Sequence, residues 1–287
     1  MAERGDLNII LKSNPRETEK IVCKAIELGY EMIAVNSTCE LTTVKSKREK
    51  QNPLGLPSFN WKELPGIKAF MDSNQNINVF SRITVKLEDQ SQLHQLASNP
   101  FSTFDILAVT PTTEKLFQQC CGSLEVDIIS LDITSRLPFY LKIPQVRQAI
   151  QRGIHFEIVY SPAIRSTSQR RYVISNALEI VRATKGRNTL LSSQAESVLD
   201  IRGPNDISNL GLLFGLKEDQ CKAAISKNAR AVLYHARGRK CTVKSAITGC
   251  YINTVPTNEM WKIGKRTEHI SNDESDGVQK KKKIKFL

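Results

Sequence analysis

Three arginines lie where an apolar run gives way to a helical pattern, in SPAIRSTSQRRYVISNA at residues 161–177. Residues 166–168 are Ser, Thr and Ser, all good N-caps, so Arg170 and Arg171 fall in the first turns of the helix. Positive charge there opposes the helix dipole by about 0.3–1 kcal/mol for each charge. A bound phosphate would reverse that sign, because free backbone N–H groups, hydroxyls and guanidinium groups bind anions. The segment predicts a phosphate site, with Arg165 as a weaker contributor.

Further basic residues follow later apolar runs. Arg202 lies in DIRGP, and HARGRK contributes a second group, which consists of Arg237, Arg239 and Lys240. We expect all of these side chains at one rim of the fold, where repeated phosphate sites with few aromatic residues favour binding of a nucleic-acid backbone by shape. Lys185 and Arg187 complete the predicted set of nucleic-acid-binding residues.

The net charge of +12 supports a polyanionic partner because of where it lies. Residues 1–150 hold 17 basic and 17 acidic side chains, residues 151–240 hold 15 and 7, and residues 241–287 hold 9 and 5. A positive field confined to one part of a chain indicates a polyanion partner.

Catalytic patterns are scarce. Of the four histidines, only His235 is expected at the carboxyl end of a strand, and Asp132 is the best placed carboxylate. Neither alone makes a metal site or an acid–base pair, and no phosphate-loop, zincin or nucleophile-elbow motif occurs. We therefore predict no catalytic residue and no metal ligand. The alternative is a metal-dependent phosphoesterase that uses Asp132 and His235. A third hypothesis is a scaffold whose basic rim meets an acidic protein.

The elements that must position these residues alternate between strands and helices. Eight short apolar runs predict strands, at 6–10, 30–36, 78–87, 104–110, 126–133, 154–160, 188–193 and 230–235. Amphipathic helix patterns occupy 15–28, 112–121, 144–152, 169–185 and 204–215. Runs that are apolar throughout are typical of parallel strands covered on both faces. This alternation predicts an α/β fold, a TIM-like (β/α)8 barrel, with a doubly wound open sheet as the competitor.

Two segments do not fit the alternation. Residues 37–76 are polar and rich in Pro and Gly, which predicts a surface insertion after the second strand. Residues 251–287 include NDESDGVQKKKKIKFL and predict a disordered, lysine-rich tail after a barrel domain at 1–250. No apolar stretch is long enough for a membrane span, and the amino-terminal residues lack the apolar core of a secretory signal. The seven scattered cysteines indicate reduced thiols.

Two blocks of the sequence resemble a known family. LPFYLKIPQVRQAIQRGIHFEIVYSPAIRSTSQRRYVISNAL and IRGPNDISNLGLLFGL are similar to the thirty-kilodalton protein subunit shared by nuclear ribonuclease P and ribonuclease MRP. The resemblance covers about residues 6–240. It implies a TIM-barrel-like fold, distantly related to the polymerase-and-histidinol-phosphatase metal hydrolases.

That resemblance also implies a function. It makes the chain a non-catalytic RNA-binding subunit that supports a catalytic RNA in removing 5′ leaders from precursor tRNA, and that is shared with ribonuclease MRP in pre-rRNA processing. The implied partners are ribonuclease P RNA, ribonuclease MRP RNA, precursor tRNA indirectly, a small ferredoxin-like subunit and other proteins of the particle. The implied location is the nucleus and nucleolus. Where the hydrolases carry an H-x-H metal motif, this chain has Asp6-Leu7-Asn8. We therefore expect no cofactor on this chain, and Mg2+ on the catalytic RNA.

Overall fold

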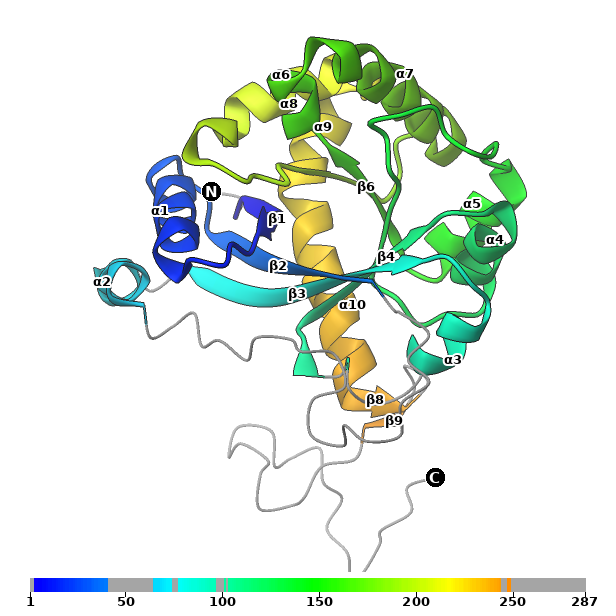
Figure 1. The fold of residues 1–287 in the computed structure, drawn as a ribbon, viewed down its shortest axis with the longest axis horizontal. Helices are drawn as coiled ribbons and strands as arrows, with labels where there is room; N and C mark the ends of the chain where they lie inside the picture. Colours follow the sequence, from blue (N-terminus) through cyan, green and yellow to red (C-terminus); the bar gives the residue numbers. More distant parts are fainter. Residues whose placement is uncertain are drawn as a thin grey trace, which may run out of the picture. The chain divides into compact units, whose positions relative to one another are not determined.

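Seven parallel strands form the central sheet in the computed structural model, which describes residues 3–40, 64–73, 77–96, 101, 103–243 and 247–248. The strands pair in chain order and carry the labels of Figure 1: β1 Gly5–Ile10, β2 Met32–Glu40, β3 Asn78–Leu87, β4 Ile106–Pro111, β5 Ile128–Ser130, β6 His155–Val159 and β7 Thr189–Ser192. A second, two-stranded sheet pairs β8 Thr242–Val243 with β9 Ile247–Thr248.

The seven-stranded sheet closes between its last and first strands. The Ile10 N–H donates to the Ala195 carbonyl at 3.0 Å, and Ile9 forms a parallel bridge with Ala195. Nearby, the carboxylate of Asp6 accepts the Ser193 N–H at 3.1 Å, so a side chain replaces a backbone partner where the two strands separate. An open doubly wound sheet would leave two free edges. The TIM-like α/β barrel is therefore confirmed, and the open-sheet alternative is wrong.

Helices surround the strands (Figure 1). Prolines occupy the first turn of five of the described helices, where the missing N–H has no helical partner to lose. The helices are α1 Pro15–Glu27, α2 Pro65–Ser73, α3 Ser91–Leu96, α4 Glu114–Gly122, α5 Ile143–Gln151, α6 Ser161–Arg165, α7 Thr167–Thr184, α8 Pro204–Leu213, α9 Glu218–Ile225 and α10 Lys227–Cys241, with a 3-10 turn η3 at Val198–Asp200. The five helices expected from sequence periodicity are all present, with shifted ends.

The eighth predicted strand is wrong. Residues 230–235 lie inside α10, whose buried side chains Ala229, Val232 and Ala236 recur at helical spacing. The Asn228 side chain donates to the Thr189 carbonyl at the start of β7, and His235 contacts Asp127 just before β5. Because α10 touches the amino ends of these strands, it lies across the bottom of the barrel (Figure 1).

Apolar side chains fill the bottom of the barrel interior. They come from five strands and from α10, and they include Leu7, Ala34, Ala108, Ile128, Leu190, Ala229 and Val232. Larger clusters lie between the strands and the surrounding helices. The strands are therefore buried on both faces, which explains their unbroken apolar sequence.

The predicted insertion is only partly correct. β2 continues through Glu40, so residues 37–40 belong to the sheet, and α2 occupies 65–73. Residues 41–63 of the insertion lie outside the described part of the chain, as do the predicted domain boundary at 250 and the tail at 251–287. No described helix is long and apolar enough to cross a membrane.

Candidate nucleic-acid interface

A cavity of about 700 Å³ opens at the carboxyl ends of the strands, where barrel enzymes hold their substrates. Uncharged polar side chains from the strands line it, among them Asn8, Asn36, Thr84 and Ser130. Charged residues of both signs from the strand ends and loops also line it: Glu40, Lys86, Asp132, Arg165 and Glu196. A mixed set of charges does not make a strong site for a polyanion.

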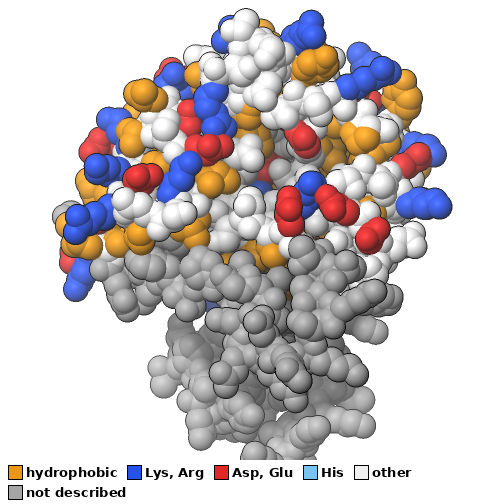
Figure 2. Space-filling view, in the orientation of Figure 1, with side chains coloured by type: hydrophobic (Ala, Val, Ile, Leu, Met, Phe, Trp, Pro, Cys, Tyr) orange, Lys and Arg blue, Asp and Glu red, His pale blue; other side chains and the backbone are white. Residues whose placement is uncertain are grey.

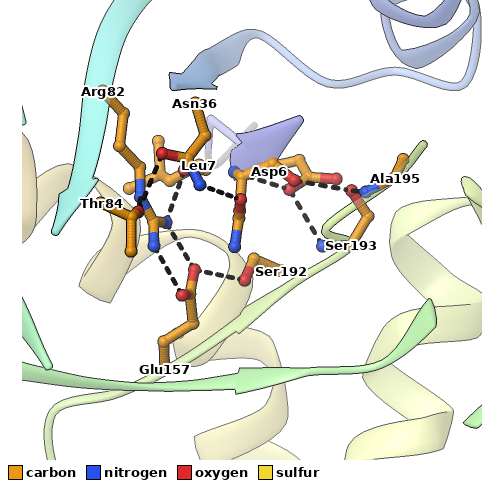
Figure 3. A network of polar contacts seen from close by, with 10 residues as sticks. Asp6, Leu7, Asn36, Arg82, Thr84, Glu157, Ser192, Ser193 and Ala195 are labelled. Atoms are coloured by element: carbon orange, nitrogen blue, oxygen red, sulfur yellow. Dashed lines mark hydrogen bonds and ion pairs between the residues drawn. The ribbon is translucent and has the colours of Figure 1, made fainter. Parts of the chain in front are cut away.

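A buried ion pair crosses the barrel interior near this cavity (Figure 3). Two nitrogens of the Arg82 guanidinium on β3 lie 2.5 and 2.6 Å from the carboxylate oxygens of Glu157 on β6, and both side chains are 0% exposed. Arg82 also donates to the Leu7 carbonyl at 2.8 Å, and the Ser192 hydroxyl donates to Glu157 at 2.5 Å. Although burial opposes ionisation, the charge of Arg82 and hydrogen bonds from Arg82, Ser130 and Ser192 lower the pKa of Glu157. Both side chains are therefore charged, and their polar atoms are hydrogen-bonded to each other and to neighbouring groups.

The donors around the cavity do not fit a metal centre. Each carboxylate on the rim already has a partner: Glu40 lies 3.6 Å from Lys86 Nζ, Glu196 lies 2.8 Å from Arg165 Nη1, and Asp132 accepts the Thr134 N–H and hydroxyl. Within the described ranges, no group of three or more His, Cys, Asp or Glu side chains could hold a metal ion.

The two residues expected to serve a phosphoesterase are far from each other in the fold. Asp132 lines the carboxyl-end cavity, whereas His235 lies at the amino end, where its Nδ1 is 2.8 Å from Asp127 Oδ1 and its Nε2 is 3.2 Å from the Arg152 carbonyl. The expected position of His235 at the carboxyl rim is therefore wrong, because its segment is a helix across the barrel bottom. The phosphoesterase alternative loses its proposed pair.

Four of the predicted basic residues, Arg165, Arg170, Arg171 and Arg202, do lie at the carboxyl end, and each of them also has a partner within the chain. Arg165 pairs with Glu196, and its Nε lies 3.9 Å from Asp200. Arg170 Nε donates to the Ala163 carbonyl at 2.8 Å, which ties α7 to α6. Arg202 donates to two carbonyls of its own loop.

The helix-end geometry expected for α7 is present. Ser166 is its N-cap, and the side chain accepts the Gln169 N–H at 3.4 Å. Arg171 is exposed, with its guanidinium 4.9 Å from the centre of the Tyr172 ring. Figure 2 shows acidic and basic side chains interspersed over the described part of this view. All four of these arginines, Arg165, Arg170, Arg171 and Arg202, are exposed, and acidic side chains such as Glu196 lie among them.

The group from HARGRK lies at the opposite end of the barrel. Arg239 Nη2 is 3.0 Å from the buried Asp127 Oδ2, and Lys240 Nζ is 2.8 Å from Asp105 Oδ1. Burial opposes ionisation of Asp105, yet Lys240 and Ser81 lower its pKa. These cations anchor α10 to the amino ends of β4 and β5, so their predicted place on the carboxyl rim is wrong. Arg237 on the same helix is exposed.

Lys185 and Arg187 lie with a residue that the sequence prediction missed. A groove of about 300 Å³ between α5 and the end of α7 is lined by Ile143, Arg147, Ile150, Ala183, Thr184, Lys185 and Arg187. Arg147 gave no motif, but a signal was available in the distribution of charge. Residues 133–195 hold ten basic and only two acidic side chains, and one of those acids, Glu157, is buried in the barrel interior. α5 and α7 carry four of these ten cations, Arg147, Arg170, Arg171 and Arg182.

Comparison with known proteins places the chain in a family. The model of "RNase P subunit p30" matches residues 3–241. The ribonuclease P protein subunit p30 of Mus musculus is 41% identical over 242 residues, which cover 84% of this chain and 88% of that protein. A probable ribonuclease P protein subunit 3 of Schizosaccharomyces pombe is 42% identical over 177 residues, 62% of this chain and 75% of that protein. A chain from an archaeal ribonuclease P with mature tRNA shares the fold, with a TM-score of 0.59 at 17% identity, covering 86% of this chain and 98% of that chain. The chain belongs to the RNase P subunit p30 family.

Proposed function

We propose that this chain is a non-catalytic, RNA-binding protein subunit of ribonuclease P, shared with ribonuclease MRP. The observation that carries the proposal is the division of charge between the inside and the outside of the barrel. Arg82 and Glu157 neutralise each other in the interior, where a hydrolase of this fold would place its catalytic groups, whereas the outer α5–α7 sector is strongly basic. Membership of the RNase P subunit p30 family supports ribonuclease P as the particle, and the distribution of charge supports RNA as the partner that the outer surface contacts.

In this role the catalytic RNA and its Mg2+ ions perform the cleavage of precursor tRNA, and the chain supports the RNA without binding a metal. Precursor tRNA is then an indirect partner, and a small ferredoxin-like subunit of the particle is the proposed protein partner. The particle is proposed to work in the nucleus and nucleolus, which fluorescence microscopy of the tagged chain would test.

Binding to defined RNAs tests the proposal. The purified full chain should bind transcripts of ribonuclease P RNA and ribonuclease MRP RNA more tightly than an unrelated RNA of equal length, and log affinity should fall steeply with log salt concentration. Equal affinity for the unrelated RNA would contradict a specific role in these particles. Hydrolysis of a phosphate ester by the RNA-free chain, with metal recovered in stoichiometric amount, would revive the phosphoesterase alternative.

A further inference from the structure

Three cations from two separate helical segments converge on the groove between α5 and α7. Ile143, Arg147 and Ile150 lie on one face of α5, and Lys185 and Arg187 follow the last residues of α7. Among the described residues, no Asp or Glu lines this groove, and none of the three cationic groups has an ion-pair partner. Three exposed like charges without a counter-charge repel each other only weakly in water, and together they attract a polyanion.

The helix dipole explains only part of this arrangement. Cations at the end of α7 are favourable because the helix leaves free carbonyls there, which accounts for Lys185 and Arg187 in a structural role. Arg147 lies in the middle of α5 and gains nothing from the dipole of that helix. Other basic residues near α5 have partners: Lys142 Nζ is 2.6 Å from Glu114 Oε1, and Arg152 donates to carbonyls at the end of α4. The three groove cations therefore differ from Lys142 and Arg152 in that no hydrogen bond or ion pair within the described residues engages their side chains.

Lys185 also has an unfavourable backbone conformation. Its φ of 57° is in the left-handed region, and Gly186 follows with a φ of 69°. Glycine is the residue that adopts this conformation without strain at the end of a helix, so a lysine there is held at a conformational cost. A cost of this kind at an exposed charged residue points to a use for the side chain.

We propose that the groove between α5 and α7 binds the phosphate backbone of the RNA, with Arg147, Lys185 and Arg187 each contacting a phosphate. This inference rests on the proposed function and assigns the RNA contact to a site outside the barrel mouth. A polyanion with regularly spaced phosphates can engage cations from two elements at once, and Ile143, which is 47% exposed, provides an apolar surface beside them for a ribose ring.

The test compares two full-chain variants in which three charges are removed. The groove variant carries Arg147→Gln, Lys185→Gly and Arg187→Gln. The control variant carries Arg16→Gln, Lys20→Gln and Lys68→Gln, which removes three exposed cations of α1 and α2. Binding to a ribonuclease P RNA transcript is measured by fluorescence anisotropy at several salt concentrations.

We expect the groove variant to lose about fivefold in affinity at 0.15 M salt for each lost phosphate contact, and its salt slope to fall by about 2 to 3. The control variant should bind as the wild type does. The single variant Lys185→Gly should have an unfolding temperature equal to or above that of the wild type while its RNA affinity falls, because glycine removes the strain and the charge together. A loss of RNA affinity without a loss of stability separates an RNA contact from a folding role.

The remaining outcomes overturn one proposal or the other. If the wild type binds the RNA and both triple variants bind equally well, the groove proposal is wrong and the proposed function stands. If the wild type binds no RNA, the proposed function itself fails. If the groove variant binds RNA normally but no longer assembles with the other protein subunits, the groove takes an acidic protein segment and the RNA assignment is wrong.

Discussion

Breaking the buried ion pair should destabilise the barrel severely. In Arg82→Met the carboxylate of Glu157 stays at 0% exposure and keeps only its hydroxyl donors, such as Ser192. Removing one partner of a buried pair costs about 3–5 kcal/mol, because the remaining charge is left without compensation. That loss is a large share of the 5–15 kcal/mol by which a domain is usually stable. Glu157→Leu should cost a similar amount.

The double variant Arg82→Met with Glu157→Leu separates charge compensation from packing. It removes both charges and leaves the Leu7 carbonyl and the Ser192 hydroxyl without their present partners, at about 1 kcal/mol each. We therefore expect the double variant to lose about 2 kcal/mol, less than either single variant. Urea unfolding followed by circular dichroism gives the free energies for the cycle.

The pH dependence adds a second readout. In the wild type the pKa of Glu157 is lower in the folded chain than its ordinary value of 4.5, so Glu157 stabilises the fold at pH values above 4.5. This stabilisation is lost as pH falls through the pKa that Glu157 has in the folded chain. Without Arg82, burial raises the pKa of Glu157, so Arg82→Met should lose less stability at pH 5 than at pH 7.5. A loss below about 1 kcal/mol in Arg82→Met, or a double variant as unstable as the sum of the singles, would refute this reasoning.

Three further predictions follow from other buried groups. Burial raises the pKa of Asp6 from 3.8 to about 6. The contribution of Asp6 to the free energy of unfolding therefore falls by up to about 3 kcal/mol as pH rises between these two values. Asp6→Asn should flatten the dependence of the unfolding temperature on pH between 4 and 7.5. Arg239→Met should lower the free energy of unfolding by about 2–3 kcal/mol, because Asp127 loses a charged partner. The same variant should bind RNA with unchanged affinity. Reduced RNA affinity in a fully folded variant would show that Arg239 contacts RNA. Burial raises the pKa of Cys120 and Cys121 to about 12, so mass spectrometry should find both thiols unmodified by iodoacetamide at pH 7.5 in the native chain, and rapid labelling of either would contradict their burial.

The barrel was predictable because its strands and helices have distinct sequence periods. Runs such as FDILAVT and IHFEIVY are buried on both faces and are apolar throughout, and α1 and α7 show the helical spacing. RAVLYH was misjudged because six residues of α10 span less than two helical turns. Over that length, a helix buried on one side and a buried strand look alike. That single error moved His235, Arg239 and Lys240 to the wrong end of the barrel.

The roles of the basic residues were harder to predict, because the sequence gives the charge of each side chain but not its ion-pair partner in the fold. Arg165 and Arg171 lie in the same basic stretch of the sequence, yet Glu196, 31 positions beyond Arg165, pairs with Arg165, whereas Arg171 lies against the ring of the neighbouring Tyr172. A pairing of that kind depends on the closure of the barrel after β7, which no local pattern reveals. Composition over a long window was the better signal, since the shortage of acids between 133 and 195 marks the sector that contains the α5–α7 groove.

Charged side chains are treated differently in the interior of the barrel and on its outer surface. Inside the barrel, the low dielectric makes an uncompensated charge costly, so Arg82 must be matched by Glu157 with close geometry. On the outside of α5 and α7, water screens each cation, and Arg147, Lys185 and Arg187 can remain without partners at small cost until a polyanion arrives. The interior pair is then a condition for the surface site, because it links β3 to β6 across the interior of the barrel on which α5 and α7 pack. Loss of Arg82 should weaken RNA binding only through unfolding, whereas loss of the groove cations should weaken it in a chain that remains fully folded.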